Sequence, residues 1–215
     1  MRLNISLIIL SAFFMALMPA EDWHLKKNNK GIAVYVRKSY KSSLKELRAV
    51  TQQKTSLSSI VALLNDWDTY PQWVYKCGKS KTLKKISDTE LIHYQTITTP
   101  WPTDNRDFVV NVKITQDPKS KVVTQRTSCI PDYIPCVKGY IRIPELKATW
   151  ILTPIKSGLI NIEYRLLVDV GGNIPAGLEN LAAVDGPYHT ILNLKQWVMK
   201  DKYQKTGLAF IKEPE

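Results

Sequence analysis

The fold of this chain is decided by one stretch, Pro100-Trp101-Pro102-Thr103-Asp104-Asn105-Arg106-Asp107-Phe108-Val109. A proline on each side of Trp101 fixes the backbone and removes an amide donor, so these residues cannot pair as a strand. From Arg106 onward, apolar side chains recur two residues apart, at Phe108, Val110, Val112 and Ile114. This is the period of a half-buried strand, so we expect a rigid aromatic loop that leads directly into a strand.

Alternating segments on both sides of this stretch predict further strands. The predicted strands cover residues 31–40, 44–54, 80–87, 90–98, 106–116, 121–128, 137–152 and 158–169. Turn-forming residues at 88–89, 117–120 and 156–158 predict hairpins. In the strand over 137–152 the apolar side changes near Pro144, which predicts a bulge that bends the sheet.

Two short helices are predicted after the second strand. Ser56 stands where an N-cap belongs, and apolar residues follow at helical spacing up to Leu64. A second helix, which we expect Pro71 to interrupt, carries an aromatic patch formed by Trp67, Tyr70, Trp73 and Tyr75.

A long C-terminal helix is predicted after Gly171-Gly172, with Asn173 as its N-cap. Its apolar side carries Leu178, Leu181, Val184, Tyr188 and Ile191. Gly186-Pro187 interrupts the pattern, because a proline inside a helix removes a hydrogen bond and produces a kink. Such a kink is either the hinge of a lid or a fixed bend that fits the helix to the sheet.

Two motifs of the chain together resemble a START (StAR-related lipid transfer) domain of the bacterial type. They are Arg106-Asp107-Phe108, which follows its loop, and Gly171-Gly172-Asn173-Ile174-Pro175, which precedes its helix. This family lies within the helix-grip superfamily, which includes the Bet v 1-like proteins. The resemblance runs from about Trp23 to Tyr203. It implies an α+β helix-grip fold, in which a curved antiparallel sheet wraps around the C-terminal helix. It also implies that sheet and helix enclose a hydrophobic cavity for one lipid.

The chain length of 215 residues suits one domain. The apolar run from Ile5 to Leu17, which follows Arg2, is short for a membrane span and ends in small residues at Ala20. We therefore expect a signal peptide over residues 1–20, a lipid-binding domain over 21–205 and a C-terminal tail over 206–215. The signal peptide predicts that the protein is exported and is periplasmic or secreted. The alternative is that this segment is an uncleaved N-terminal anchor.

The chain is basic, with 30 Lys and Arg against 19 Asp and Glu and a formal net charge of +11. This charge favours transient contact with anionic membrane surfaces. Its lysine clusters, at 26–30 and 79–85, lack the interleaved aromatic residues of a nucleic-acid surface, so we expect no nucleic acid as a partner. We expect a monomer.

The three cysteines are Cys77, Cys129 and Cys136. A turn-rich segment between Cys129 and Cys136 could bring the two into bridging range, so they either form a disulfide or remain free, with Cys77 as a buried thiol. No metal-ligand spacing and no cofactor motif is found, so we expect neither a metal nor a cofactor.

The alternation of side chains along each strand indicates which polar residues face the expected cavity. Tyr164 shares its side of the strand with Ile160 and Ile162 and faces inward, and Arg106 lies at the inner rim. A guanidinium there could bind a phosphate or carboxylate head group, or could form a structural ion pair with Asp104 or Asp107. The predicted lipid-binding residues are Arg106, Phe108, Val110, Tyr164, Leu181, Val184 and Tyr188.

Trp101 has two interpretations. In START-like proteins its loop flanks the cavity entrance, where a tryptophan would enter the membrane interface. Alternatively the ring packs under the loop as a hydrophobic plug.

An enzyme is the second function class. The chain lacks a nucleophile elbow, a phosphate loop, a dinucleotide fingerprint and a zinc-protease motif, so no catalytic residue is predicted. Asp185 and His189 lie four residues apart on the final helix and are the best candidates for a general base and the residue that orients it. A surface contact explains the two residues better. We therefore expect non-enzymatic binding and transfer of one lipid; the alternatives are a cyclase or hydrolase of the same fold and a ligand-sensing module.

Overall fold

A computed structural model of the protein describes residues 22–39, 44–172 and 184–214. Its strands, in chain order, are β1 (His24–Asn29), β2 (Ile32–Lys38), β3 (Lys45–Lys54), β4 (Cys77–Lys85), β5 (Glu90–Ile97), β6 (Asn105–Gln116), β7 (Val123–Cys129), β8 (Tyr140–Arg142), β9 (Glu145–Ile155) and β10 (Leu159–Asp169). Its α-helices are α1 (Leu57–Asn65), α2 (Tyr70–Trp73), α4 (Gly186–Trp197) and α5 (Asp201–Gln204). Three 3-10 turns are η1 (Trp67–Thr69), η2 (Pro131–Tyr133) and η3 (Lys156–Gly158).

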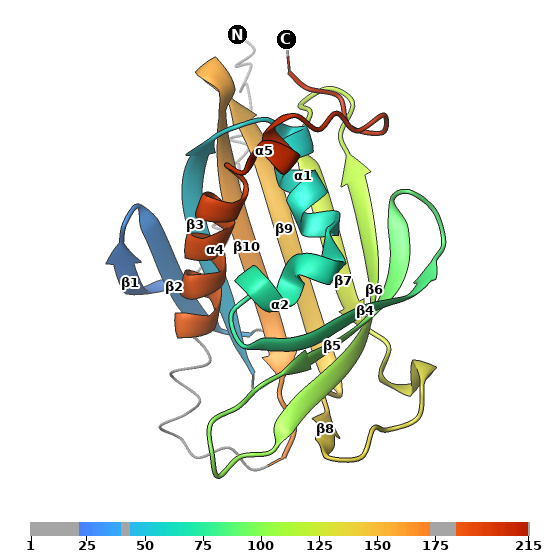
Figure 1. The fold of residues 1–215 in the computed structure, drawn as a ribbon. Coiled ribbons are helices and arrows are strands. Elements are labelled where there is room, and N and C mark those ends of the chain that lie inside the picture. The colour runs from blue at the N-terminus through green and yellow to red at the C-terminus, as the bar shows by residue number, and fades with distance from the viewer. Residues whose placement is uncertain (1–21, 40–43, 173–183, 215) are drawn as a thin grey trace, which may run out of the picture.

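All strands belong to one curved sheet with the order β1-β2-β3-β10-β9-β7-β6-β5-β4 (Figure 1). Neighbours along this path are antiparallel, and the short strand β8 adds to β6 in parallel. The sheet does not close, since β1 and β4 stand at its two ends. β10, the last of these strands in the chain, pairs with the early strand β3. The sheet curves around the helices (Figure 1).

The helices lie in front of the sheet, on the side toward which it curves (Figure 1). α4 packs across β2 and β3, and α2 packs against β4 and α4. The core lies between these layers and includes Ile191 and Leu194 of α4 together with Ile32, Val34 and Ala49 of the strands. The predicted α+β helix-grip fold is thus confirmed.

The sequence prediction missed β1. Its residues are mostly polar and exposed, as suits an edge strand that must resist pairing with other chains, so no apolar alternation marks it. Lys30 and Gly31 both have positive φ angles, 51° and 69°, and form the two-residue turn into β2. The prediction that residue 31 opens the first strand was therefore wrong, because Gly31 belongs to the turn.

The single strand predicted over residues 137–152 was also wrong. The structure has two strands here, β8 parallel to β6 and β9 antiparallel to β7 and β10. Pro144 lies between them, where the amide donor that proline lacks is not needed by a ladder. The change of apolar side near Pro144 therefore marks a change of partner strand.

Two side chains cap the N-terminus of α1. The Ser56 side chain accepts from the amide of Ser59 at 3.0 Å, which confirms the predicted N-cap. The carboxylate of Glu213 accepts from the amides of Leu57 at 2.9 Å and Ser58 at 2.8 Å. Residues 206–214, expected as a tail, thus pack against the domain as far as Glu213, and Ile211 is buried in the core.

Pro71 does not interrupt α2. It stands at the first turn of that helix, where the missing amide has no helical partner in any case.

Pro187 occupies the same kind of position in α4, which begins at Gly186 directly after a π turn at Val184 and Asp185. The predicted N-cap Asn173 and the helix residues Leu178 and Leu181 lie outside the described residues, as does the predicted leader over 1–20. Within the described part of the chain, no helix is long and apolar enough to cross a membrane.

Candidate functional site

Two adjoining chambers lie between the sheet and the helices. The larger, here called the outer chamber, has a volume of about 430 Å³, and the smaller, the inner chamber, about 110 Å³. Both are lined by Val74, Gln95, Phe108, Leu146, Tyr164 and Thr190, so the two chambers adjoin at these shared side chains. The predicted cavity is therefore present.

The outer chamber is mainly apolar. Its walls come from the inner faces of β5, β6, β9 and β10, from the loop after β5 and from the start of α4. The apolar lining residues include Ile97, Ile143, Leu166, Val168, Val170 and Pro187. Among the described residues that line it, Lys76 and Arg106 carry positive charge and none carries a carboxylate. The hollow thus combines apolar walls with positive charge.

Arg106 is the second residue of β6 and is only 2% exposed. Its guanidinium donates to three backbone carbonyls, from Nη1 to Asp104, from Nε to Val170 at 3.3 Å and from Nη2 to Gly171 at 3.1 Å. The expected ion pair with Asp104 or Asp107 is not what holds it, since its acceptors are backbone oxygens. These bonds orient the guanidinium but leave its charge without a carboxylate partner among the described residues.

Gly171 and Gly172 shape the backbone that receives Arg106. Both have positive φ angles, 62° and 66°, which residues with a Cβ rarely adopt. A Cβ on Gly172 would lie 3.1 Å from the side chain of Ile141 and 3.7 Å from Nη2 of Arg106. The two glycines are therefore required for the close approach of this turn to β6 and β8.

Asp107 points away from the chamber and pairs with Arg142 of β8. The two form a bidentate ion pair, Nε to Oδ1 at 2.9 Å and Nη2 to Oδ2 at 3.0 Å, with both side chains buried. Arg142 also donates to the carbonyls of Pro131, Ile134 and Pro135. Arg142 therefore organises the loop over 130–139, next to the chamber wall.

Of the two alternatives left open for Cys129 and Cys136, the structure has the free thiols and no disulfide between them. The Cys129 thiol donates to the carbonyl of Ile143 at 3.3 Å, and Cys136 is exposed. The carbonyls held by Arg142 set the path of the intervening loop, so the loop needs no covalent bridge for its shape. Cys77 is a buried thiol, as expected, and burial raises its pKa to about 12.

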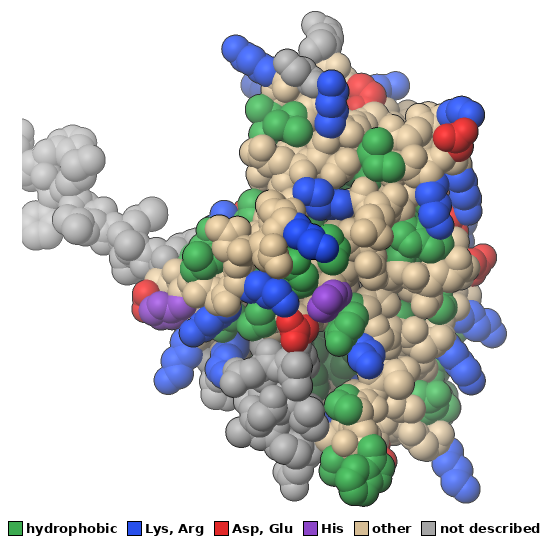
Figure 2. All heavy atoms as spheres, turned by 60° about the vertical axis from the view of Figure 1, so that its left-hand side comes forward, with side chains coloured by type: hydrophobic (Ala, Val, Ile, Leu, Met, Phe, Trp, Pro, Cys, Tyr) green, Lys and Arg blue, Asp and Glu red, His purple; other side chains and the backbone are tan. Residues whose placement is uncertain are grey.

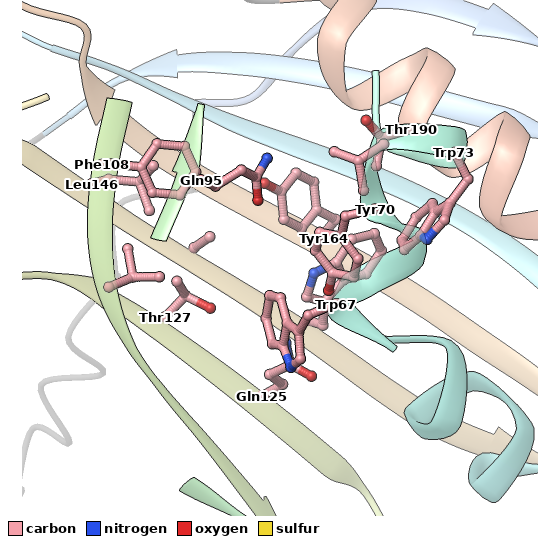
Figure 3. Close-up of a pocket in the computed structure, with 14 residues that line it drawn as sticks. Trp67, Tyr70, Trp73, Gln95, Phe108, Gln125, Thr127, Leu146, Tyr164 and Thr190 are labelled. Carbon is pink, nitrogen blue, oxygen red and sulfur yellow. The ribbon is translucent and has the colours of Figure 1, made fainter. Parts of the chain in front are cut away.

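Aromatic rings form the walls of the inner chamber (Figure 3). Trp150 stacks on Tyr164 with ring centroids 4.3 Å apart, and Tyr70 packs edge-on against Trp73 at 5.0 Å. Burial raises the pKa of both Tyr70 and Tyr164 far above the ordinary value, so neither phenol ionises near neutral pH. The inner chamber is therefore uncharged and lined by rings and hydrogen-bonding groups.

Trp101 is 91% exposed, at the tip of the loop between β5 and β6. The interpretation of this ring as a hydrophobic plug was wrong. Thr99, Pro100 and Thr103 of the same loop line the outer chamber, so the exposed indole stands on a loop that forms part of the chamber wall. Lys and Arg side chains are spread over the visible face of the molecule rather than gathered in one patch (Figure 2).

The predicted lipid-binding residues divide into three groups. Arg106, Phe108, Val110 and Tyr164 line the chambers, as expected. Leu181 lies outside the described residues. Val184 and Tyr188 line neither chamber: Tyr188 is buried in the core with the ammonium of Lys27 4.0 Å above its ring. The cavity side of α4 carries Gly186, Pro187 and Thr190 instead, because the helix turns Tyr188 and Ile191 into the core.

Asp185 and His189 do not act on one another. Asp185 pairs with Lys27 at 2.8 Å, and His189 stacks on Tyr75 at 5.1 Å. The interpretation of the two as surface contacts agrees with this geometry. No group of three His, Cys, Asp or Glu residues that could hold a metal occurs within the described ranges.

Sequence reasoning missed several chamber residues. Gln95 and Gln125 are buried polar residues on inner strand faces, and Trp67, Trp73 and Trp150 supply rings. A signal was available for Gln125, since Val123, Gln125 and Thr127 alternate along β7 and place two polar side chains on the side of a buried valine.

Comparison with known proteins assigns the family. A family model described as "START domain" matches residues 12–186. The chain is 35% identical over 176 residues, 82% of its length, to the uncharacterized protein PA1579 of Pseudomonas aeruginosa, covering 86% of that protein.

Solved structures agree. The crystal structure of a STAR-related lipid transfer protein from Xanthomonas axonopodis has a TM-score of 0.76 at 34% identity, covering 83% of this chain and 99% of that one. Human StAR-related lipid transfer protein 5 has a TM-score of 0.75 at 15% identity, covering 83% and 87%, which shows the shared fold. With its two decisive motifs in contact beside the hollow that they frame, the chain belongs to the START domain family.

Proposed function

We propose that this protein binds one amphiphilic lipid in its two chambers and carries it between membranes. The observation that supports this most directly is a buried guanidinium, Arg106, in the wall of a mainly apolar hollow of about 430 Å³. Removal of the ligand's apolar surface from water supplies the affinity, at about 25 cal/mol per Å². Arg106 and Tyr164 orient the polar end of the ligand.

The charge of Arg106 favours an anionic head group. Arginine stays protonated in proteins, and a buried charge without an opposite charge carries a large desolvation penalty. The carbonyls of Asp104, Val170 and Gly171 satisfy hydrogen bonds but do not neutralise the charge. A carboxylate or phosphate at the chamber wall would do so, since the guanidinium fork binds both.

Membrane contact is the second part of the proposal. An exposed, proline-flanked Trp101 stands on the loop whose other residues line the outer chamber. Tryptophan prefers the head-group region of a bilayer, and a net charge of +11 attracts anionic surfaces. Docking through Trp101 would place the opening of the outer chamber against the lipid. Export by a cleaved leader over residues 1–20 belongs to the same proposal, with an aqueous compartment outside the cytoplasm as the place of transfer.

Native mass spectrometry of the purified protein, followed by solvent extraction, tests the binding. We expect one lipid per chain, released on denaturation and identified in the extract. A bare mass that stays unchanged after incubation with mixed liposomes contradicts the proposal.

Head-group preference is tested on the same protein with hexadecanoic acid and its methyl ester. The two share a chain and differ in charge, so tighter binding of the acid is expected from Arg106. Equal binding of acid and ester means that the guanidinium serves the loop alone.

A further inference from the structure

Gln125 is a buried amide in the wall of the inner chamber. It lies in the middle of β7, between Ile114 of β6 and Trp150 of β9, and is 2% exposed. A glutamine side chain carries one acceptor oxygen and two amide protons, all of which need partners when buried. The contacts of this amide therefore decide what the chamber can bind.

The oxygen of the Gln125 amide is unpaired. Its Oε1 atom is buried and has no hydrogen-bond partner among the described residues. The neighbouring Tyr70 hydroxyl donates its proton to the carbonyl of Leu64 at 2.6 Å, so that proton is not available to Gln125.

Two indole groups in the same wall also lack a hydrogen-bond partner among the described residues. Nε1 of Trp67 and Nε1 of Trp73 are buried and have no acceptor within the described part of the chain. Trp67 is held in place by a ring contact with Tyr70 at 4.5 Å (Figure 3). A second ring contact joins it to His93 at 4.3 Å. An indole nitrogen can only donate.

Among the described residues, the side chains that line the inner chamber thus include one unpaired acceptor and two unpaired donors. A hydrocarbon tail would leave all three unpaired, which is costly in a buried site. A hydroxyl group fits this set, because it donates one proton and accepts through its oxygen.

We infer that the inner chamber binds a hydroxyl group carried at the end of the ligand that enters first. Its proton goes to Oε1 of Gln125, and its oxygen accepts from the indole N–H of Trp67 or Trp73. The inference rests on the proposed function and narrows it: the ligand is a hydrophobic molecule with a hydroxyl remote from the head group that Arg106 holds.

The test compares hexadecanoic acid with ω-hydroxyhexadecanoic acid, which adds only the remote hydroxyl. Titrations are followed by tryptophan fluorescence and repeated with the tetradecanoic and dodecanoic pairs, so that chain length is varied. We expect the wild-type protein to bind the hydroxy acid of the best-fitting length roughly tenfold more tightly than its parent, as a hydrogen bond to a buried unpaired group implies.

Gln125→Leu removes the acceptor at nearly constant volume and should abolish this preference while the parent acid still binds. Gln125→Met serves the same purpose if the leucine variant melts early. Val110→Ala, which trims an apolar side chain of the same chamber, is the matched control and should weaken both acids alike.

The outcomes separate the inference from the proposal beneath it. Equal affinity for parent and hydroxy acid at every chain length overturns the inference and leaves lipid binding intact. A preference that survives Gln125→Leu, or an equal loss for both acids, also overturns it. If neither acid of any length binds, the proposed function fails and the inference falls with it.

Discussion

Nη2 of Arg106 donates to the carbonyl oxygen of Gly171 at 3.1 Å, across 65 residues of sequence. This bond joins the two motifs by which the fold can be recognised, the loop before β6 and the glycine pair after β10. Gly171 and Gly172 reach this position through positive φ angles. One side chain thus holds the end of the sheet in place and, together with Lys76, supplies positive charge to the outer chamber.

Arg106→Lys keeps the charge but loses the fork that reaches three carbonyls. We expect the free energy of unfolding to fall by about 2 kcal/mol, because buried carbonyls lose their donors. Urea denaturation measures the change. Binding of hexadecanoic acid should be retained in part, because the ammonium still attracts the carboxylate; unchanged stability would mean that the three carbonyl contacts contribute little.

Trp101→Ala removes the exposed indole from the loop that forms part of the chamber wall. Because the ring is 91% exposed, the melting temperature should stay the same, while binding to anionic liposomes should weaken. Vesicle co-sedimentation and a thermal melt check the two parts. Ile86→Ala is the control, since Ile86 is also exposed and lies at the opposite end of β5, where we expect no effect on liposome binding. Equal effects of the two variants would contradict docking through this loop.

The ion pair of Asp107 and Arg142 is buried, so its loss should be costly. Asp107→Asn leaves the guanidinium of Arg142 without its opposite charge, and we expect a loss of about 3 kcal/mol in the free energy of unfolding. Glu145→Gln breaks the exposed pair with Lys147 and should cost less than about 0.5 kcal/mol. Chemical denaturation of the two variants side by side decides the matter, and similar losses would contradict the role given to burial.

His93 is neutral in the folded protein, and its tautomer follows from its neighbours. Ser80 donates its hydroxyl proton to the carbonyl of Trp67 at 2.6 Å, so Nε2 of His93, 3.1 Å from the Ser80 oxygen, carries the ring proton. Nδ1 has no partner among the described residues. A second proton would therefore place a charge in the core, and burial lowers the pKa of His93 from 6.5 to about 3.

This lowered pKa makes stability depend on pH in a defined window. Below pH 6.5 the unfolded chain binds a proton at His93 that the folded chain does not, so stability falls as the pH falls toward about 3. Within this window, the free energy of unfolding should fall by about 1.4 kcal/mol for each unit by which the pH falls. His93→Gln should flatten the dependence measured by urea denaturation between these values. The exposed His24 is the control, and identical slopes for wild type, His24→Gln and His93→Gln would refute the assignment.

Several features of the fold and of the site follow from local pattern. Alternation along β6 and β10 placed Phe108, Val110 and Tyr164 inside, and the structure confirms them as chamber walls. The N-cap at Ser56 was correctly predicted from residue type and position. Such features are readable because a strand period of two, or a capping hydroxyl, depends only on residues close in sequence.

Predictions from local sequence pattern were wrong where contact with a distant part of the chain determines the structure. β1 is polar and is a strand because it pairs with the edge of β2. β8 is a separate strand because it pairs in parallel with β6. Tyr188 lies on the predicted apolar side of its helix, yet the packing of α4 on β2 and β3 turns it into the core rather than into the chamber.

The sequence by itself determined the inward side of the main strands and the placement of Arg106 at the rim, because periodicity and turn chemistry act over a few residues. Its two motifs indicated the helix-grip architecture through their resemblance to START domains. Only the tertiary structure decided that Arg106 bonds Gly171, that Glu213 caps α1 and that the Gln125 oxygen is left without a partner among the described residues. Hydrogen bonds are short and directional, so their partners are selected only when distant segments have packed into one geometry.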